Sequence, residues 1–132
     1  MSVMKILLAE DDVDDREFFY SFLKERLDIE LLPAVENGVE LFEYLGKQMD
    51  NSTFPGAIIL DQNMPKLNGL QTLQMLKDNP RYAHIPVMMY TTYAEENLVQ
   101  RSTNAGAIIV MEKPTTEQNY NNMVDRFIEV IG

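Results

Sequence analysis

The chain has 132 residues, with 11 Lys and Arg against 21 Asp and Glu, so its formal net charge is −10 at pH 7; this charge repels phosphate backbones and argues against direct binding to nucleic acid. The absence of cysteine excludes disulfides, thiolate metal sites and cysteine nucleophiles. The length suits one domain, residues 1–132, with no output domain. Because neither a signal-peptide core nor an apolar run of about 18 residues is present, we expect a cytoplasmic protein with no membrane role.

Four short, continuous apolar runs predict strands that are buried on both faces, as in a parallel sheet. These runs are residues 6–9, 57–60, 87–90 and 108–111. A fifth candidate strand, residues 29–35, contains Pro33. Because proline cannot donate to a sheet ladder, we expect this strand to lie at an edge of the sheet.

Apolar residues at helical spacing lie between these runs and predict helices. The stripes are Phe18-Phe19-Phe22-Leu23-Leu27, Leu41-Phe42-Leu45-Met49, Leu70-Leu73-Leu76 and Met123-Val124-Phe127-Ile128-Ile131. Residues 95–104 offer only Leu98 and Val99 and predict a weaker helix. Alternating strands and helices predict an α/β fold of five βα units, (βα)5, with a parallel sheet and helices on both faces.

Polar residues follow four of the strands at the point where each run ends. They are Glu10 and Asp11, Asp61, Thr91, and Glu112 and Lys113. Open parallel sheets bind ligands beyond the carboxyl ends of their strands. We therefore expect carboxylates, a hydroxyl and an ammonium from distant parts of the chain to meet at one edge.

These residue types suit phosphoryl chemistry. Clustered carboxylates raise one another's pKa unless a cation intervenes, and a site made of oxygen ligands suits Mg2+. Asp61 can then act as a nucleophile, because aspartate forms acyl phosphates. Lys113 and the metal would neutralise the transferring phosphoryl group, and Thr91 would donate its hydroxyl to a phosphoryl oxygen.

Four separated motifs carry a family resemblance. They are Leu8-Ala9-Glu10-Asp11-Asp12, Ile59-Leu60-Asp61-Gln62-Asn63-Met64-Pro65 with Gly69, Tyr90-Thr91-Thr92, and Glu112-Lys113-Pro114. In this order the chain resembles the response-regulator receiver domain of two-component systems over nearly its whole length. Residues 47–56 and 79–86 are similar to stand-alone receivers paired with phytochrome-type sensor kinases. The resemblance implies a doubly wound, flavodoxin-like sheet in the order 2-1-3-4-5.

The resemblance also implies the site's roles. Asp61 would be the phosphoacceptor and, with Asp11, a direct Mg2+ ligand. The backbone carbonyl of Asn63 would complete the protein ligands, and Glu10 would act through water. The phosphoryl group would come from a sensor histidine kinase or phosphotransfer protein. The domain would then act on a downstream protein and would be no enzyme beyond its own phosphorylation and dephosphorylation.

Two further residues receive roles from the resemblance. Lys113 would pair with the Asp61 carboxylate or the phosphoryl oxygens, and its peptide bond to Pro114 is expected to be cis. Thr91 would move toward the phosphoryl group and so shift the populations of an inactive and an active surface.

The chain departs from the family pattern at two positions. Val110 stands where the family usually has an aromatic switch residue, so the coupling between Thr91 and an aromatic ring is either absent or transferred to Tyr93. Thr92 is larger than the small residue common after the switch threonine, which would tighten access to the site.

The acidic run after the first strand has a simpler interpretation. Asp12 stands where the first helix should begin, and we expect it to cap that helix rather than bind metal. Asp14, Asp15 and Glu17 fall in the first helical turn, where acidic residues suit the helix dipole. We expect them to form a solvated face.

The same residues argue against two other classes of function. A magnesium-dependent phosphatase of the haloacid type needs a second acid two residues after the nucleophile, where Asn63 stands, and a cap for which 132 residues leave no length. A flavodoxin-like electron carrier needs a phosphate-binding loop after the first strand. Glu10, Asp11 and Asp12 would repel that phosphate.

Overall fold

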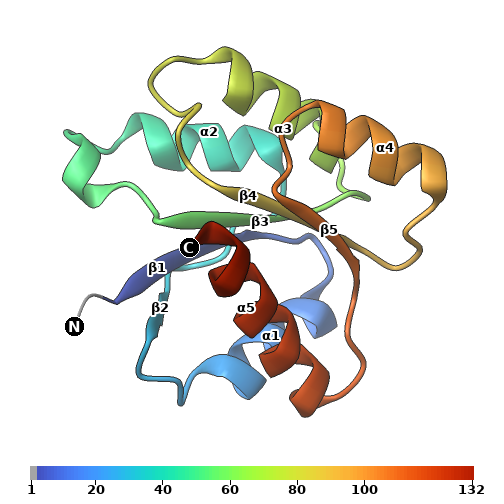
Figure 1. Cartoon of the computed structure of the whole chain (residues 1–132). Coiled ribbons are helices and arrows are strands. Elements are labelled where there is room, and N and C mark those ends of the chain that lie inside the picture. The colour runs from blue at the N-terminus through green and yellow to red at the C-terminus, as the bar shows by residue number, and fades with distance from the viewer. Residues whose placement is uncertain (1–2) are drawn as a thin grey trace.

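A single parallel sheet of five strands forms the centre of the molecule (Figure 1). The computed structural model describes residues 3–132. The strands are β1 (Met4–Ala9), β2 (Ile29–Leu31), β3 (Ala57–Asp61), β4 (Val87–Thr91) and β5 (Ile109–Glu112). Their spatial order is β2-β1-β3-β4-β5, and each neighbouring pair is parallel. This is the doubly wound, flavodoxin-like sheet that the family resemblance implies.

Helices cover both faces of the sheet. They are α1 (Val13–Leu23), α2 (Gly38–Gly46), α3 (Gly69–Asp78), α4 (Glu96–Asn104) and α5 (Glu117–Ile131), with a short 3-10 turn η1 (Asn51–Thr53) before β3. Figure 1 shows α1 and α5 on one face and α2, α3 and α4 on the other. Parallel strands need such crossover connections, and right-handed crossovers place the helices in these two outer layers.

Alternate side chains of the central strands serve the two faces. Along β3, Ile58 and Leu60 pack into the cluster under α2 and α3, whereas Ala57 and Ile59 pack into the cluster under α1 and α5. All four are fully buried. The prediction of strands buried on both faces is therefore confirmed for β3, and the last four residues of β1 and all of β4 are equally buried.

The apolar run at residues 108–111 differs from that prediction. It overlaps β5, which lies at an edge of the sheet. The side chains of the first three residues of β5, Ile109 to Met111, are only partly buried. Ile108, just before the strand, is 40% exposed. An edge strand has a neighbour on one side only, and the sequence run does not reveal this position. The other edge is β2, as Pro33 predicts, although the strand ends before the proline.

Two predicted stripes extend beyond their helices. Helix α1 ends at Leu23 and α2 at Gly46, and the last apolar residues of the two stripes, Leu27 and Met49, are 87% and 92% exposed. After each of the two helices the chain makes a tight turn. The Arg26 N–H donates to the Leu23 carbonyl over 3.1 Å, and the Gln48 N–H donates to the Leu45 carbonyl over 3.1 Å. The stripes of α3 and α5 lie inside their helices.

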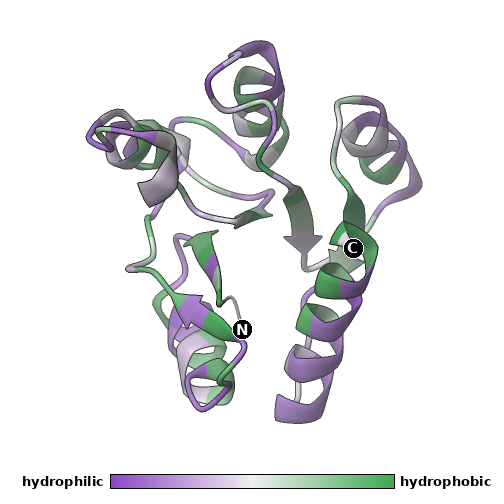
Figure 2. Ribbon diagram, turned by 60° about the vertical axis from the view of Figure 1, so that its left-hand side comes forward, coloured by the Kyte–Doolittle hydropathy of each residue, from purple (hydrophilic) through white to green (hydrophobic). Residues whose placement is uncertain are grey.

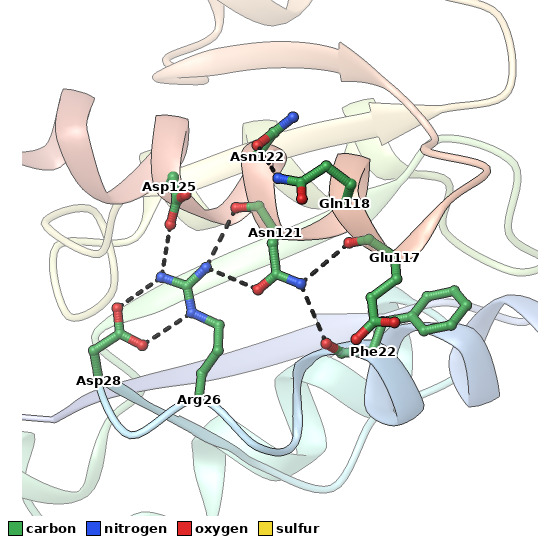
Figure 3. Close-up of polar contacts among 8 residues, drawn as sticks. All are labelled: Phe22, Arg26, Asp28, Glu117, Gln118, Asn121, Asn122 and Asp125. Carbon is green, nitrogen blue, oxygen red and sulfur yellow. Dashed lines mark hydrogen bonds and ion pairs between the residues drawn. The ribbon is translucent and has the colours of Figure 1, made fainter.

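A polar clamp fastens α5 to the turn after α1 (Figure 3). The Arg26 guanidinium donates to both carboxylate oxygens of Asp28, over 2.9 and 2.7 Å, and its Nη2 lies 2.8 Å from Asp125 Oδ1 of α5. It also donates to the backbone and side-chain oxygens of Asn121, each over 3.3 Å. Asn121 and Asp125 follow Arg26 by at least 95 residues, so the clamp joins two distant parts of the chain.

Figure 2 shows that α5 is hydrophilic in its first turns and hydrophobic near the C-terminus. The residues that it buries are Tyr120, Met123, Val124 and Phe127. Within residues 3–132, no helix is both long enough and apolar enough to cross a membrane.

Candidate functional site

Three carboxylates meet at the carboxyl edge of the sheet. Glu10 follows β1, Asp11 follows Glu10, and Asp61 is the last residue of β3. Each offers one oxygen, and these oxygens lie within 4.8 Å of one another. Glu10 and Asp61 are buried, whereas Asp11 is exposed. The structure thus brings together the acidic residues that the sequence predicts, because β1 and β3 are adjacent and parallel.

The surroundings of Asp61 disfavour its ionised form. Burial, and after it the charge of Glu10, raises the pKa of Asp61 to about 7, against the opposing effect of Lys113. Its Oδ1 atom is buried and has no hydrogen-bond partner among the described residues. A buried carboxylate oxygen without a donor, beside two further carboxylates, fits a divalent cation as the missing partner.

Lys113 is the cation of the site. Its Nζ lies 2.8 Å from Asp15 Oδ2, 2.9 Å from Glu10 Oε1 and 3.4 Å from Asp61 Oδ2. Although burial disfavours the charged form, hydrogen bonds to Asp15 and Glu10 raise the pKa of Lys113 above its usual value. The ammonium is therefore charged, and it lies closer to Glu10 and Asp15 than to Asp61.

Asp15 departs from the predicted solvated face on α1, whereas Asp14 and Glu17 are exposed as predicted. Its side chain is only 29% exposed and forms an ion pair with Lys113. Asp15 stands in the first turn of α1, and that turn is fixed by Asp12, whose side chain accepts the Asp15 N–H over 2.9 Å. The predicted cap at Asp12 is thus confirmed, and its helix delivers a fourth carboxylate to the site.

Tyr90 stands in one of the four sequence motifs, but its role as a site residue was not predicted. It lies in an apolar strand, is fully buried, and its hydroxyl donates to Glu10 Oε1 over 2.6 Å. Burial, and after it the charge of Glu10, raises the pKa of the Tyr90 hydroxyl, which keeps it protonated as a donor. The β3–β4 register, which pairs Asp61 with Tyr90, is the signal that could have identified it.

The loop after Asp61 depends on close backbone approach. A Cβ atom at Gly69 would lie 2.4 Å from the Asp61 carbonyl oxygen, so only glycine fits there. The backbone carbonyl and side-chain oxygen of Gln62 accept the N–H groups of Gly69 and Leu70, over 3.1 and 2.8 Å. Asn68 and its neighbours then begin α3 with a capping box. The start of α3 is therefore fixed against the strand that carries Asp61.

Thr91 lies on the opposite side of the sheet edge from Lys113. It is buried at the end of β4 and borders a hollow of about 340 Å³ that Asn63, Tyr93 and Arg101 also line. Tyr93 is 71% exposed. The hollow borders α4, whereas Lys113 pairs with Asp15 of α1, so the two residues lie against different helical layers.

Not every residue near Lys113 takes part in the site. Glu112 is exposed and accepts the Ala94 N–H over 3.1 Å, so it secures the loop after β4 instead of joining the acidic cluster. The Lys113–Pro114 peptide bond is trans, which corrects the expectation of a cis bond. Val110 is partly buried and packs against the cluster under α2 and α3.

Comparison with known proteins places the chain in one class, the response regulators of two-component signalling. The family described as response regulator receiver domain matches residues 6–125, and the chain belongs to this family. Chemotaxis protein CheY1 of Helicobacter pylori is 32% identical over 115 residues, which cover 87% of this chain and 89% of that protein.

Two solved structures are similar in both sequence and fold. The Mn2+-bound form of response regulator Rcp1 is 31% identical, with a TM-score of 0.78, and the match covers 93% of this chain and 90% of that one. The phosphorylated cyanobacterial phytochrome response regulator RcpA is 26% identical, with a TM-score of 0.82, and the match covers 97% and 93% of the two chains. The resemblance to phytochrome-associated receivers therefore agrees with these structures.

Proposed function

We propose that this receiver domain accepts a phosphoryl group on Asp61 from a sensor histidine kinase or phosphotransfer protein, in the cytoplasm, and then changes a protein-interaction surface. The observation that carries the proposal is the buried Asp61 carboxylate, which has one unpartnered oxygen and lies 3.4 Å from the Lys113 ammonium. Residues 1–132 act as one receiver unit whose output is contact with a downstream protein.

The acidic residues at the site suit Mg2+. Asp11 and Asp61 would bind it directly, the backbone carbonyl of Asn63 would be a third protein ligand, and Glu10 would act through water. Supporting this assignment, Glu10 already accepts donors on both of its oxygens, from Tyr90 and Lys113 on Oε1 and from the Asp12 N–H on Oε2. When bound, Mg2+ supplies positive charge that offsets the carboxylates and the phosphoryl oxygens.

The chain's own residues account for the transfer. An oxygen of the Asp61 carboxylate attacks phosphorus, a new O–P bond forms, and the P–N bond to the donor histidine breaks, leaving its electron pair on the imidazole. The product is an acyl phosphate on Asp61. Lys113 stabilises the negative charge on the phosphoryl oxygens, and Thr91 donates its hydroxyl to one of them.

Intact mass measures this directly. The native protein is incubated with Mg2+ and acetyl phosphate, beside Asp61→Asn and a control, Asp78→Asn, which alters an exposed carboxylate on α3. We expect one phosphoryl group on the native protein and on the control, and none on Asp61→Asn. A native protein that is folded and gains no mass, or an Asp61→Asn variant that still does, would contradict the proposal.

A further inference from the structure

We propose that Tyr90 is a positioning residue for phosphorylation: its hydroxyl holds the buried Glu10 carboxylate so that Lys113 can leave Glu10 for the phosphoryl group on Asp61. The inference rests on the proposed function and adds to it Tyr90, a residue to which the family resemblance assigns no role.

The sheet register brings Tyr90 to the site. Asp61 and Tyr90 are partners in the parallel β3–β4 pair, so their side chains leave the sheet on the same face. On that face Tyr90 packs among the residues under α1 and α5. Its hydroxyl reaches Glu10 Oε1 at 2.6 Å, and its ring lies 5.2 Å from Lys113 Nζ. Tyr90 thus contacts both members of the Glu10–Lys113 ion pair.

The Lys113 ammonium lies near three carboxylates but not at equal distances from them. It has short contacts with Asp15 and Glu10 and a longer one, 3.4 Å, with Asp61. A phosphoryl group on Asp61 brings further negative oxygens, toward which the ammonium must move. This movement weakens the Lys113–Glu10 contact and leaves a carboxylate with 0% exposure short of one donor.

A buried carboxylate that loses its cation is costly unless other donors remain. The Asp12 N–H serves Oε2 of Glu10, whereas the only other donor to Oε1 among the described residues is the Tyr90 hydroxyl. The hydroxyl therefore lowers the cost of moving Lys113. Phenylalanine would fill the same space in the strand, so Tyr90→Phe removes this donor and little else.

The test measures the rate constant of phosphorylation by acetyl phosphate at saturating Mg2+. A hydrogen bond to a charged group has a net value equivalent to about a tenfold change or more in an equilibrium, so we expect Tyr90→Phe to react about tenfold more slowly. The acyl phosphate forms on Asp61 with loss of acetate in both proteins. Tyr20→Phe is the matched control, because it removes a tyrosine hydroxyl that donates to the Leu32 carbonyl, away from the site.

A double-mutant cycle separates positioning from a general structural effect. Glu10→Gln removes the charge that retains Lys113, so adding Tyr90→Phe to Glu10→Gln should change the rate much less than it does in the native protein. Urea unfolding without Mg2+ provides a second reading that needs no phosphorylation. We expect Tyr90→Phe to lower the urea midpoint more in the native protein than in Glu10→Gln.

The outcomes are distinct. A tenfold loss in Tyr90→Phe that disappears in the Glu10→Gln background supports the role of Tyr90. Native-like phosphorylation of folded Tyr90→Phe, or an equal loss in both backgrounds, would overturn it while leaving Asp61 as the acceptor. A native protein that gains no phosphoryl group would instead contradict the proposed function itself.

Discussion

Helices α5 and α4 flank the same edge strand but are anchored very differently. Helix α5 buries Tyr120, Met123, Val124 and Phe127 and is clamped to the α1 turn by Arg26. Helix α4 buries only Ser102, whose hydroxyl has no partner among the described residues, and its first turn has no side-chain cap. The fold therefore fixes one side of the site firmly and the other weakly.

This difference matters because the site receives residues from both sides. Lys113 leads from β5 into α5 and is held by Asp15 of α1. Thr91 leads into the loop that precedes α4. Regions with few buried apolar contacts open at lower free energy than well-packed ones. On the proposed function, movement of Thr91 should therefore displace the α4 side while α1 and α5 stay in place.

The largest expected effect compares apolar truncations in the two helices. Phe127→Ala in α5 removes a fully buried ring and should lower the free energy of unfolding by about 3–5 kcal/mol. Leu98→Ala in α4, a half-buried position, should cost about 1 kcal/mol. Urea unfolding measures both, and equal costs would remove the contrast between the helices.

The Arg26 clamp should contribute less than the apolar core. Arg26→Ala loses charge-assisted hydrogen bonds to partly exposed partners, and we expect a loss of about 2 kcal/mol. Arg126→Ala is the matched control on the outer face of α5, where the pair with Glu129 is exposed on both sides. We expect it to change stability by about 0.5 kcal/mol at most. A clamp variant as stable as the control would show that packing alone holds α5.

Asp61 lies between the two sides and should make stability depend on pH. Its folded-state pKa, about 7, is raised above its unfolded value, so the folded state binds the proton more tightly. Stability without metal should fall as pH rises from about 4 through 7 and level off above that.

The variant Asp61→Asn isolates this contribution. It should stabilise the protein more at pH 8 than at pH 4, by about 3–4 kcal/mol. Urea unfolding at both pH values gives the difference, and Asp78→Asn should show no comparable change. The opposite sign would mean that Lys113 outweighs burial and Glu10 at this carboxylate.

The smallest effect should be a gain on the α4 side. Ser102→Ala removes a buried, unpartnered hydroxyl and improves helix propensity, so we expect about 1 kcal/mol of added stability. Thr103→Ala in the same helix, at an exposed position, should gain only the propensity. Amide hydrogen exchange should slow across α4 in Ser102→Ala. Unchanged exchange would place the weakness of α4 elsewhere, for example at its uncapped start.

The features that sequence predicted well are those set by neighbouring residues. Continuous apolar runs predicted the central strands, and the residues after them predicted the acidic edge, because parallel strands end together. The features it missed depend on tertiary position. Asp15 looked like any acid in a first helical turn, and Tyr90 looked like any aromatic in a buried strand, yet both contact the site across 98 and 80 residues of sequence.

The sequence pattern also did not predict that residues 108–111 are only partly buried. An apolar run shows that a strand can be buried on both faces, but not whether a second strand lies beside it. Leu27 and Met49 extended their helical stripes in sequence, and the tight turns before them redirected the chain. Hydrophobic spacing alone does not give the last turn of a helix.

The close approach of Gly69 to Asp61 has a mechanical consequence. The backbone of β3 is braced at the acceptor by the start of α3, with no space for even a methyl group between them. A group attached to Asp61 therefore cannot make room for itself by pushing its own strand or α3 backward. On the proposed function, the phosphoryl group should therefore be accommodated on the side of the hollow that Asn63, Thr91 and Tyr93 line, away from the start of α3.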